Sequence, residues 1–407
     1  MNEAMPNTLR LFQTNRAIAG RVVLQIIPSL DSGGAERTTL EIVEALVRVG
    51  ARALVAAEGG RLVGELQALG GEFHAFPAAT KNPFAMAANV RRLARLIERQ
   101  GVDLVHARSR APAWVALGAS RRRGVPFVTT YHGVYSARSE MKVRYNSVMA
   151  MGDRVIANSD FTARHVVESY PFAAGRVATI HRGVDLRLFA PEAVGADRVR
   201  ALRESWKVPP DVRIVLMPAR LARRKGHRVF IDAARILRAD GRRDLAFILA
   251  GDEERDAYPR EIDRWAGDAG LSGIVRRVGH CADMPAALLA AACVVAPALE
   301  PEAFGRIGVE AQAMGAPVVV SDLGASVETV FAPPEALPAE RTGWRVPPGD
   351  APALADAIAE ALDLRAAARD ALAMRARHRV SDLFSIEKMC ASTLLLYESL
   401  LEPTPAG

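Results

Sequence analysis

The 407-residue chain has only three cysteines, Cys281, Cys293 and Cys390, and none belongs to a CxxC pair. Their odd number and wide spacing disfavour a disulfide framework or a zinc site, and such cysteine usage suits a reducing cytoplasm. Apolar runs long enough to cross a membrane are also lacking, because the stretch LLAAACVVAPALE is short and is interrupted by a proline. The sequence therefore disfavours a disulfide-stapled secreted domain and an integral membrane protein.

Residues 1–20 have no continuous apolar segment, which disfavours a signal peptide. We expect this segment to be a flexible leader. A chain without a signal peptide or a membrane span is predicted to be cytoplasmic, and a peripheral position on the inner face of the cytoplasmic membrane is compatible with that prediction.

Charge is distributed unevenly along the chain, whose net charge is +7. Residues 81–170 contain 15 Lys or Arg against 6 Asp or Glu, so the remainder is slightly acidic. A basic N-terminal half indicates an anionic partner, either a nucleic acid or an anionic membrane face, although a solvated surface gives the same composition. Aromatic residues make up only 6% of the chain and do not alternate with the arginines, which argues against nucleic-acid binding.

Strand-like apolar runs alternate with amphipathic helical stretches, and glycines punctuate the alternation. This pattern predicts α/β architecture with parallel sheets covered by helices. The length favours two domains. We predict two Rossmann-like, doubly wound domains at residues 21–195 and 196–382 that face a central cleft, and a C-terminal helix in 383–407 that returns to the first domain. Ligands of such domains bind at the C-terminal ends of the strands.

Two candidate site elements lie in the first domain. Gly33 and Gly34 follow the first strand and open the first helix, where backbone N–H groups and the helix dipole favour an anion. An ordinary strand-to-helix turn would look the same, and the pattern is not GxGxxG, so NAD binding is weakly supported. His132 stands at the end of a later strand, where a catalytic role and a structural hydrogen bond are both open.

The second domain carries a basic loop and a pair of carboxylates. In ARLARRKGH, Arg220 and Lys225 follow the domain's first strand and could hold a diphosphate, whereas we expect the neighbouring Arg223, Arg224 and Arg228 to be solvated. In PEAFGRIGVE, Glu302 lies beyond a strand end and Glu310 lies on the next helix. Carboxylates accept hydrogen bonds from sugar hydroxyls, so two of them at different depths fit two different sugars. The alternative for Glu310, an exposed helix acid, fits poorly because its neighbours are apolar.

These motifs together resemble those of the family 4 glycosyltransferases, which are retaining enzymes of GT-B architecture. The resemblance runs from IIPSLDSGGAE through TTYHG, IHRGVDLRLFAP, ARLARRKG and EAFGRIGVEAQAMGAPVVVSD to TGWRVPPGD. It implies that Gly33 and Gly34 approach the donor, that His132 lies beside the transferred sugar, and that Arg220 and Lys225 hold the diphosphate. It also implies that Glu302 binds the transferred sugar, that Glu310 binds the ribose, and that backbone amides around Phe304 and Gly305 face the sugar. The sequence departs from the family pattern at PAR, which replaces GR, and at GAS, which replaces a double glycine after Asp322.

The implied reaction moves a hexosyl unit from a UDP-, GDP- or ADP-sugar to a glycan or glycolipid, as in lipopolysaccharide core or other envelope biosynthesis. No two aspartates are two positions apart, so the acidic motif that holds a metal in other glycosyltransferases is absent. We therefore expect catalysis without a cofactor or a divalent metal, with cations and helix N-termini neutralising the leaving diphosphate.

The acceptor is expected on the basic first domain. One helical stretch there carries Arg91, Arg92, Arg95 and Arg99 beside apolar residues, and a later one ends in Arg121, Arg122 and Arg123. A basic amphipathic helix can lie on an anionic membrane, although a helix that covers a sheet has the same pattern. Other functions left open are a sugar-nucleotide epimerase or soluble oligosaccharide synthase of the same architecture and, more distantly, a noncatalytic binding protein.

Overall fold

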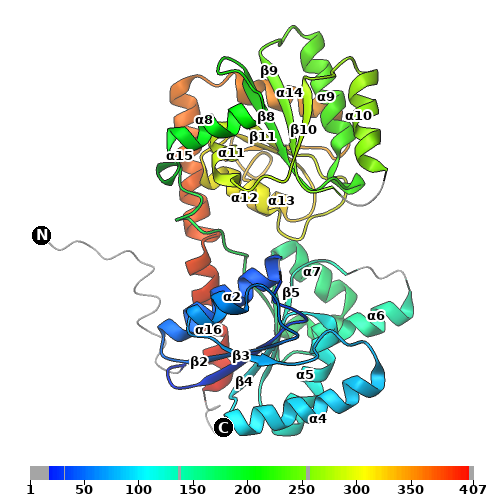
Figure 1. The fold of residues 1–407 in the computed structure, drawn as a ribbon, viewed down its shortest axis with the longest axis vertical. Coiled ribbons are helices and arrows are strands. Elements are labelled where there is room, and N and C mark those ends of the chain that lie inside the picture. The colour runs from blue at the N-terminus through cyan, green and yellow to red at the C-terminus, as the bar shows by residue number, and fades with distance from the viewer. Residues whose placement is uncertain (1–17, 32, 136–138, 254–256, 403–407) are drawn as a thin grey trace, which may run out of the picture. The chain divides into compact units, whose positions relative to one another are not determined.

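The computed structural model describes residues 18–31, 33–135, 139–253 and 257–402. The chain forms two compact units (Figure 1). Unit 1 comprises the chain up to Gly183 together with the C-terminal segment from Ile386, and unit 2 comprises Val184–Ser385. Most of the leader expected at 1–20 lies outside the described residues. Its end is part of unit 1, since Ile18 is fully buried and the Gly20 N–H donates to the Gly50 carbonyl at 2.9 Å.

Unit 1 is built on a seven-stranded parallel sheet with the order β3-β2-β1-β4-β5-β6-β7. Three neighbouring strands, β1, β4 and β5, are buried at every residue, which reflects helices on both faces of the sheet. The strands are β1 (Val22–Ile26), β2 (Arg52–Ala57), β3 (Glu72–Ala75), β4 (Leu104–Ala107), β5 (Phe127–Tyr131), β6 (Arg154–Ala157) and β7 (Val177–Thr179).

The helices of unit 1 follow its strands in alternation. They are α2 (Gly34–Arg48), α3 (Val63–Ala68), α4 (Pro83–Gln100), α5 (Arg110–Arg123), α6 (Glu140–Asn146) and α7 (Asp160–Ser169), with 3₁₀ turns at Ser147–Ala150 and Pro171–Arg176. Helix α4 shows the local signals clearly. The Asn82 side chain caps the N–H groups of Phe84 and Ala85, Pro83 occupies the first turn, and Gly101 ends the helix in a left-handed conformation.

Unit 2 is built on a six-stranded parallel sheet with the order β10-β9-β8-β11-β12-β13. Its strands are β8 (Arg213–Pro218), β9 (Leu245–Ala250), β10 (Val275–Gly279), β11 (Ala291–Ala296), β12 (Val318–Ser321) and β13 (Trp344–Val346). Its helices are α8 (Ala196–Ser205), α9 (His227–Ala239), α10 (Tyr258–Asp268), α11 (Met284–Ala290), α12 (Arg306–Ala313), α13 (Ser326–Thr329), α14 (Ala351–Leu362) and α15 (Ala366–Leu383), with 3₁₀ turns at Pro191–Ala193 and Arg223–Lys225.

The division between the units falls at 183/184, twelve residues before the predicted boundary at 195/196. Phe189 and Val194, which the predicted boundary assigns to the first domain, are buried in the core of unit 2. The Val184 N–H also donates to the Phe384 carbonyl at 2.8 Å, so both ends of unit 2 are held together. Burial of these two apolar side chains, rather than the local charge pattern, decides where the unit begins.

The last helix, α16 (Ile386–Leu401), packs on unit 1 against α2. Met389, Cys390, Leu394 and Tyr397 are buried with the apolar residues of α2. The predicted return of the C-terminal helix to the N-terminal domain is thus confirmed. Among the described residues, no helix combines the length and the hydrophobicity that a membrane span requires.

Candidate functional site

The loop that follows β8 lies against the loop that follows β11, which is the neighbouring strand in the sheet. The Leu299 N–H donates to the Arg224 carbonyl at 2.8 Å. Gly226 makes this approach possible, because it has φ 83° and a Cβ there would lie 3.0 Å from the Pro297 carbonyl carbon and closer still to its oxygen. The basic motif and the acidic motif therefore meet at one edge of the sheet.

Lys225 and Glu302 form an ion pair through Nζ and Oε1. The two side chains are about one-fifth exposed, so the pair lies at the border between protein and solvent. An ammonium group has three donors, and a carboxylate has about four acceptor sites. Each partner therefore keeps capacity for a ligand while the other fixes its position, and the diphosphate and sugar roles stay predictions.

The loop after β12 holds the backbone of Glu302 from the other side. The Ala325 N–H donates to the Glu302 carbonyl at 3.0 Å. Gly324 has φ 63°, and a Cβ there would lie 2.8 Å from the Glu302 carbonyl oxygen and 2.9 Å from its nitrogen. The segment GAS, which departs from the double glycine of the family, thus retains the one glycine that this close approach needs.

Phe304 and Gly305 carry Glu302 into helix α12. The Phe304 ring is buried in the core of unit 2, where it makes an edge contact with Phe384 at a centroid distance of 5.8 Å. Gly305 caps α12 with φ 73°, a conformation that favours glycine. The aromatic side chain therefore anchors the loop, and a contact between the backbone amides here and a sugar stays a prediction.

Glu310 is buried on α12, with a side chain only 5% exposed. Arg306 Nη2, one helical turn earlier, donates to Glu310 Oε1 at 2.6 Å. An exposed helix acid is excluded by this burial. A charged carboxylate is retained inside a protein when it is paired or when it binds a ligand, and the Arg306 guanidinium, which is half exposed, supplies one such partner.

The arginines near Lys225 separate into two groups. Arg220 is exposed in the loop after β8, and its carbonyl accepts from the Ala222 N–H at 2.8 Å. Arg223 pairs with Glu261 and stacks over Tyr258, and Arg228 pairs with Asp232 and stacks over Trp265. The solvated role that the sequence analysis gave to Arg223 and Arg228 is confirmed, while Arg224 is half-buried and fixes the loop through its carbonyl.

In unit 1 the glycine pair lies where β1 leads into α2. Gly33 is the residue before the helix and has φ 146°, whereas Gly34 is the first helical residue and is not among the glycines of positive φ. The Arg182 guanidinium donates to the Gly34 carbonyl. Sequence reasoning missed Arg182, because nothing in the motif IHRGVD indicates that its side chain reaches a turn 148 positions earlier.

His132 follows β5 and lines a polar cavity of about 20 Å³, room for about one water molecule. Its Nε2 is buried and has no hydrogen-bond partner among the described residues. Burial lowers the pKa of His132 well below its usual value, and the charges of Arg108 and Arg182 lower it further. The imidazole is therefore neutral at pH 7, with its free ring nitrogen in the cavity.

Lining residues of this cavity, among them His106, Arg108 and Thr130, belong to a hydrogen-bonded network that sequence reasoning also missed. Arg108 is 3% exposed and donates twice to Gln25 Oε1, at 2.8 and 2.6 Å. His106 Nδ1 lies 2.5 Å from the Tyr397 hydroxyl of α16, and its Nε2 lies 2.7 Å from Thr130 Oγ1. The returning helix thus fixes the strand ends beneath His132.

A second cavity of unit 1, of about 570 Å³, is basic. Three of its described lining residues, Lys81, Arg110 and Lys142, are cationic and none is a carboxylate. Arg110 is held by Asn146 Oδ1 at 2.9 Å and lies over the Tyr135 ring. These cations come from three separate segments of the chain. The sequence therefore indicated only the overall basic charge of residues 81–170 and not the cavity itself.

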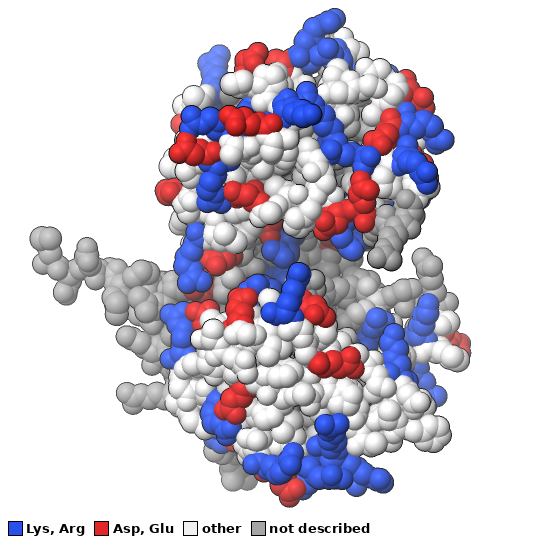
Figure 2. Space-filling model, viewed as in Figure 1, with Lys and Arg blue, Asp and Glu red and all other residues white. Residues whose placement is uncertain are grey.

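The predicted basic amphipathic helix is α4. Leu93, Leu96 and Ile97 are buried in the core of unit 1, so the apolar face covers the sheet. Arg91, Arg92, Arg95 and Arg99 are exposed, and in Figure 2 Lys and Arg side chains gather over this helix. These three apolar side chains are therefore unavailable for insertion into a membrane, and the arginine face is exposed to solvent.

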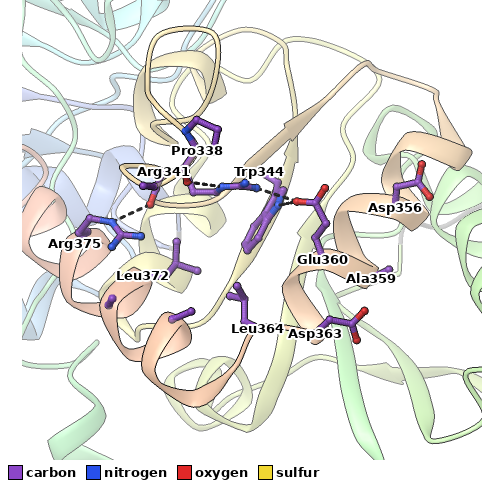
Figure 3. A pocket seen from close by; sticks show the side chains of 13 residues that line it. Pro338, Arg341, Trp344, Asp356, Ala359, Glu360, Asp363, Leu364, Leu372 and Arg375 are labelled. Atoms are coloured by element: carbon purple, nitrogen blue, oxygen red, sulfur yellow. Dashed lines mark hydrogen bonds and ion pairs between the residues drawn. The ribbon is translucent and has the colours of Figure 1, made fainter.

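A larger groove of unit 2, of about 840 Å³, contains none of the predicted site residues. Figure 3 shows Trp344 and Arg341 converging on Glu360 of α14, with N–O distances of 2.8 and 3.0 Å. Arg375 of α15 donates to the Arg341 carbonyl at 3.3 Å. These interactions are internal to the unit and join α14 and α15 to β13.

Two family models match the chain: Glycosyltransferase Family 4 over residues 32–188, and Glycosyl transferases group 1 over residues 199–379. A solved glycosyltransferase from Rickettsia africae is 32% identical and superposes with a TM-score of 0.86, covering 95% of this chain and all of that one. The chain belongs to the family 4 glycosyltransferases. Its fold is GT-B, with two Rossmann-like domains, as the sequence predicted.

Curated relatives match over part of their length. D-inositol 3-phosphate glycosyltransferase 1 of Catenulispora acidiphila is 34% identical over 54% of this chain and 56% of its own. The D-inositol 3-phosphate glycosyltransferase of Mycobacterium tuberculosis is 30% identical over 77% of this chain and 65% of its own. The chain thus spans less than two thirds of these relatives. HepE of Anabaena, solved with UDP and glucose, is 23% identical with a TM-score of 0.78, covers 93% of this chain and all of its own, and shares the fold.

Proposed function

We propose that the protein is a retaining glycosyltransferase that moves a hexosyl unit from a nucleotide-sugar donor to an anionic acceptor. The observation that carries this proposal is the Lys225–Glu302 ion pair at the strand ends of unit 2. A cation for a diphosphate and a carboxylate for sugar hydroxyls lie there side by side. The nucleotide-sugar relatives of this fold, such as HepE with UDP and glucose, support a donor of this class.

The donor would be held by unit 2. Lys225 and Arg220 would bind the diphosphate, Glu302 the hydroxyls of the hexose, and Glu310 the ribose. Breaking the sugar–phosphate bond leaves positive charge on the sugar ring and negative charge on the diphosphate. Lys225 would then stabilise the leaving group, and Glu302, fixed by Lys225, Gly324 and Ala325, would hold the sugar in the reactive orientation.

Unit 1 would supply His132 beside the transferred sugar. Because burial and two arginines keep the imidazole neutral, His132 would add no positive charge beside the sugar. That property suits a site in which the sugar itself becomes cationic. Gly33 and Gly34 would place the N-terminus of α2 beside the donor, where its partial positive charge favours an anion.

The acceptor is proposed to carry a phosphate or carboxylate that binds in the basic cavity. Lys81, Arg110 and Lys142 converge there, and cationic side chains without a carboxylate among the described lining residues suit an anion. The curated relatives are named for an inositol phosphate, which is an acceptor of this charge. An envelope or lipopolysaccharide glycan that carries such a group stays our prediction for the biological acceptor.

The donor part is tested by thermal unfolding against a panel of UDP-, GDP- and ADP-sugars, because a ligand of the folded state raises Tm as its concentration exceeds Kd. We expect one nucleotide class to stabilise the wild type and to lose that effect in Lys225→Met. Arg223→Met is the matched control, because Arg223 is tied to Glu261 on the surface. A panel without any stabilising nucleotide-sugar would contradict the proposal.

The acceptor part is tested by steady-state kinetics with anionic acceptors and their neutral analogues. Lys81→Gln and Lys142→Gln should raise the acceptor KM and leave the donor KM unchanged, whereas the exposed Lys388→Gln on α16 should change neither. Equal turnover of charged and neutral acceptors would contradict an anionic acceptor. Turnover of the donor to a second sugar nucleotide without any acceptor would instead indicate an epimerase.

A peripheral membrane position is tested by flotation with liposomes of anionic and neutral lipids at low and moderate salt. We expect salt-sensitive binding to anionic liposomes that falls when Arg91, Arg92, Arg95 and Arg99 are changed to Gln, since each exposed basic residue contributes about 1 kcal/mol near such a surface. The matched control changes four exposed arginines of unit 2, Arg200, Arg235, Arg260 and Arg264. Equal flotation of both variants would contradict a role for α4.

A further inference from the structure

The space beside Gly34 is filled by an arginine rather than left open for a ligand. A Cβ placed on Gly34 would lie 2.6 Å from Arg182 Cζ and closer still to both terminal nitrogens. The same guanidinium donates to the Gly34 carbonyl. Gly34 is the first residue of α2 and is not among the glycines of positive φ, so its backbone alone does not require glycine. The absence of a side chain is needed because the guanidinium occupies that position.

Gly33 differs from its neighbour in this respect. Its φ of 146° is a conformation that other residues rarely adopt, and a Cβ there would lie 3.2 Å from Glu36 Cδ. Glycine at 33 therefore serves the backbone turn, while glycine at 34 serves a side chain from elsewhere in the fold. The two glycines of one motif thus answer to different physical requirements.

Arg182 also lines the cavity of His132. That cavity contains two further basic groups, His106 and Arg108, and the buried Nε2 of His132 without a described partner. The N-terminus of the fifteen-residue helix α2 adds partial positive charge at Gly34. A planar guanidinium has five N–H donors in a fixed arrangement, so one bond to Gly34 leaves others directed elsewhere.

We propose that Arg182 is a positioning residue of the transferase, which locks the β1–α2 turn through the Gly34 carbonyl and places a fixed positive charge beside His132. The proposal rests on the proposed function in so far as that turn is taken to face the donor. It gives a separate physical reason for glycine at position 34, beside the expectation that the backbone there approaches the donor. Arg182 and Gly34 act as one unit in this account, which makes their coupling measurable.

The test is a double-mutant cycle with Gly34→Ala, Arg182→Met and the double variant. Gly34→Ala should displace the guanidinium rather than unfold the helix, because the atoms it meets are the far end of a flexible side chain. We therefore expect each single variant to lower kcat/KM by a similar factor, on the order of 10-fold, and the double variant to lose no more than the worse single one. Losses that multiply in the double variant would overturn the proposal.

Matched controls are Gly64→Ala on α3, where a Cβ meets nothing within 4 Å, and Arg235→Met, an exposed arginine of α9. Both should retain wild-type kcat/KM. Arg182→Lys keeps the charge without the planar fork, so it should recover part of the loss. A decline in Gly34→Ala without any coupling to position 182 would return Gly34 to a direct ligand contact and would overturn the inference.

Two measurements distinguish a positioning role of Arg182 from a role in stability alone, and distinguish failure of this inference from failure of the proposed function. They are the pH dependence of kcat/KM and thermal unfolding. Loss of the Arg182 charge should shift the acidic limb of the kcat/KM profile to higher pH, because His132 then protonates more easily; an unmoved limb with reduced kcat would count against positioning. Thermal unfolding of the same four proteins needs no substrate. Tm should fall in Arg182→Met but not fall further in the double variant, and this coupling tests the contact even if no nucleotide-sugar binds.

Discussion

Lys225 and Glu302 are 77 positions apart in the chain and form an ion pair in the structure. The pair exists because β8 and β11 are neighbours in the sheet, so the loops after them share one edge. Gly226 lets the loop after β8 pass close to Pro297. Gly324 lets the loop after β12 pass close to the Glu302 backbone. The ion pair is thus built from two loops, and the geometry of its surroundings depends on glycines in the loops after β8 and β12.

Replacement of Lys225 and replacement of Glu302 should both lower activity, but for different reasons: Lys225 would stabilise the leaving diphosphate, and Glu302 would hold the sugar. Lys225→Met should lower kcat about 10- to 100-fold, since a hydrogen bond to a charged group contributes about 1.5–3 kcal/mol. Glu302→Gln should lower kcat/KM similarly by weakening its hold on the sugar hydroxyls. Because the two side chains touch, the double variant should lose less than the product of the single losses, and strictly multiplicative losses in steady-state kinetics would contradict a shared site.

Glu310 should act on binding of the nucleotide and little on the chemical step. The ribose is remote from the bond that breaks, so its contacts stabilise ground state and transition state alike. We expect Glu310→Gln to raise the donor KM about 10-fold with kcat nearly unchanged. The wild type should discriminate against a 2′-deoxyribose donor or a 3′-deoxyribose donor, and Glu310→Gln should not. Retention of the full ribose preference in the variant would remove Glu310 from this role.

His132 should make activity sensitive to acid and insensitive to mild alkali. The groups around it are His106, Arg108 and Arg182, and burial with the two arginine charges lowers its pKa well below the usual value of about 6.5. Protonation therefore begins only in acid, so the kcat/KM profile should be flat around pH 7 and fall well below pH 6.5. Arg108→Met should shift that fall to higher pH, and His132→Asn should abolish it. A limb centred near pH 6.5 in the wild type would contradict this assignment.

Catalysis should not require a divalent metal. The sequence lacks two aspartates at a spacing of two, and Lys225 with Arg220 would carry the charge of the leaving diphosphate. We expect turnover measured in excess EDTA to equal turnover in magnesium, after the protein has been passed through a chelating column. If activity disappears in EDTA and returns with magnesium, a metal ion rather than Lys225 and Arg220 neutralises the leaving diphosphate, and the prediction is wrong.

The sequence predicted the fold well because local signals and apolar periodicity agree in most elements. The local signal is weak in α15, which has only Leu372, Ala376 and Val380 buried among eighteen residues and so shows little amphipathic pattern. The sequence analysis misplaced the domain boundary, because charged residues around Phe189 concealed an apolar anchor. In both cases tertiary packing, not the local pattern, determines the element.

In the candidate site too, local sequence patterns indicated some residues, and tertiary contacts were needed to identify others. Residues inside one motif, such as Glu302 and Glu310, could be selected from the sequence because their spacing and apolar surroundings are local. Arg182 and the basic cavity could not, because their significance arises only when segments far apart in the chain meet. The sequence analysis placed the Gly34 backbone beside the donor, which stays a prediction, and the structure adds that the Arg182 guanidinium lies where a Cβ of residue 34 would be.

Acid should destabilise unit 2 through His227, a fully buried residue of α9 that lies near the Tyr258 hydroxyl at 3.3 Å. Burial lowers its pKa to about 4, and the charge of Lys225 contributes to this depression. In the unfolded chain the pKa is about 6.5, so between pH 6.5 and 4 the unfolded state takes up a proton that the folded state does not. The stabilisation is present above pH 6.5 and is lost as pH falls, by at most about 3 kcal/mol at pH 4.

Urea unfolding at a series of pH values measures this loss. His227→Phe keeps the edge contact with the Tyr258 ring and removes the titrating group. We expect it to lower the free energy of unfolding at pH 7, since the Tyr258 hydroxyl loses a partner, but to flatten the dependence between pH 6.5 and 4. His106 and His132 have depressed pKa values in unit 1, so a residual slope from that unit should persist. An unchanged slope for unit 2 in His227→Phe would show that another group controls its acid stability.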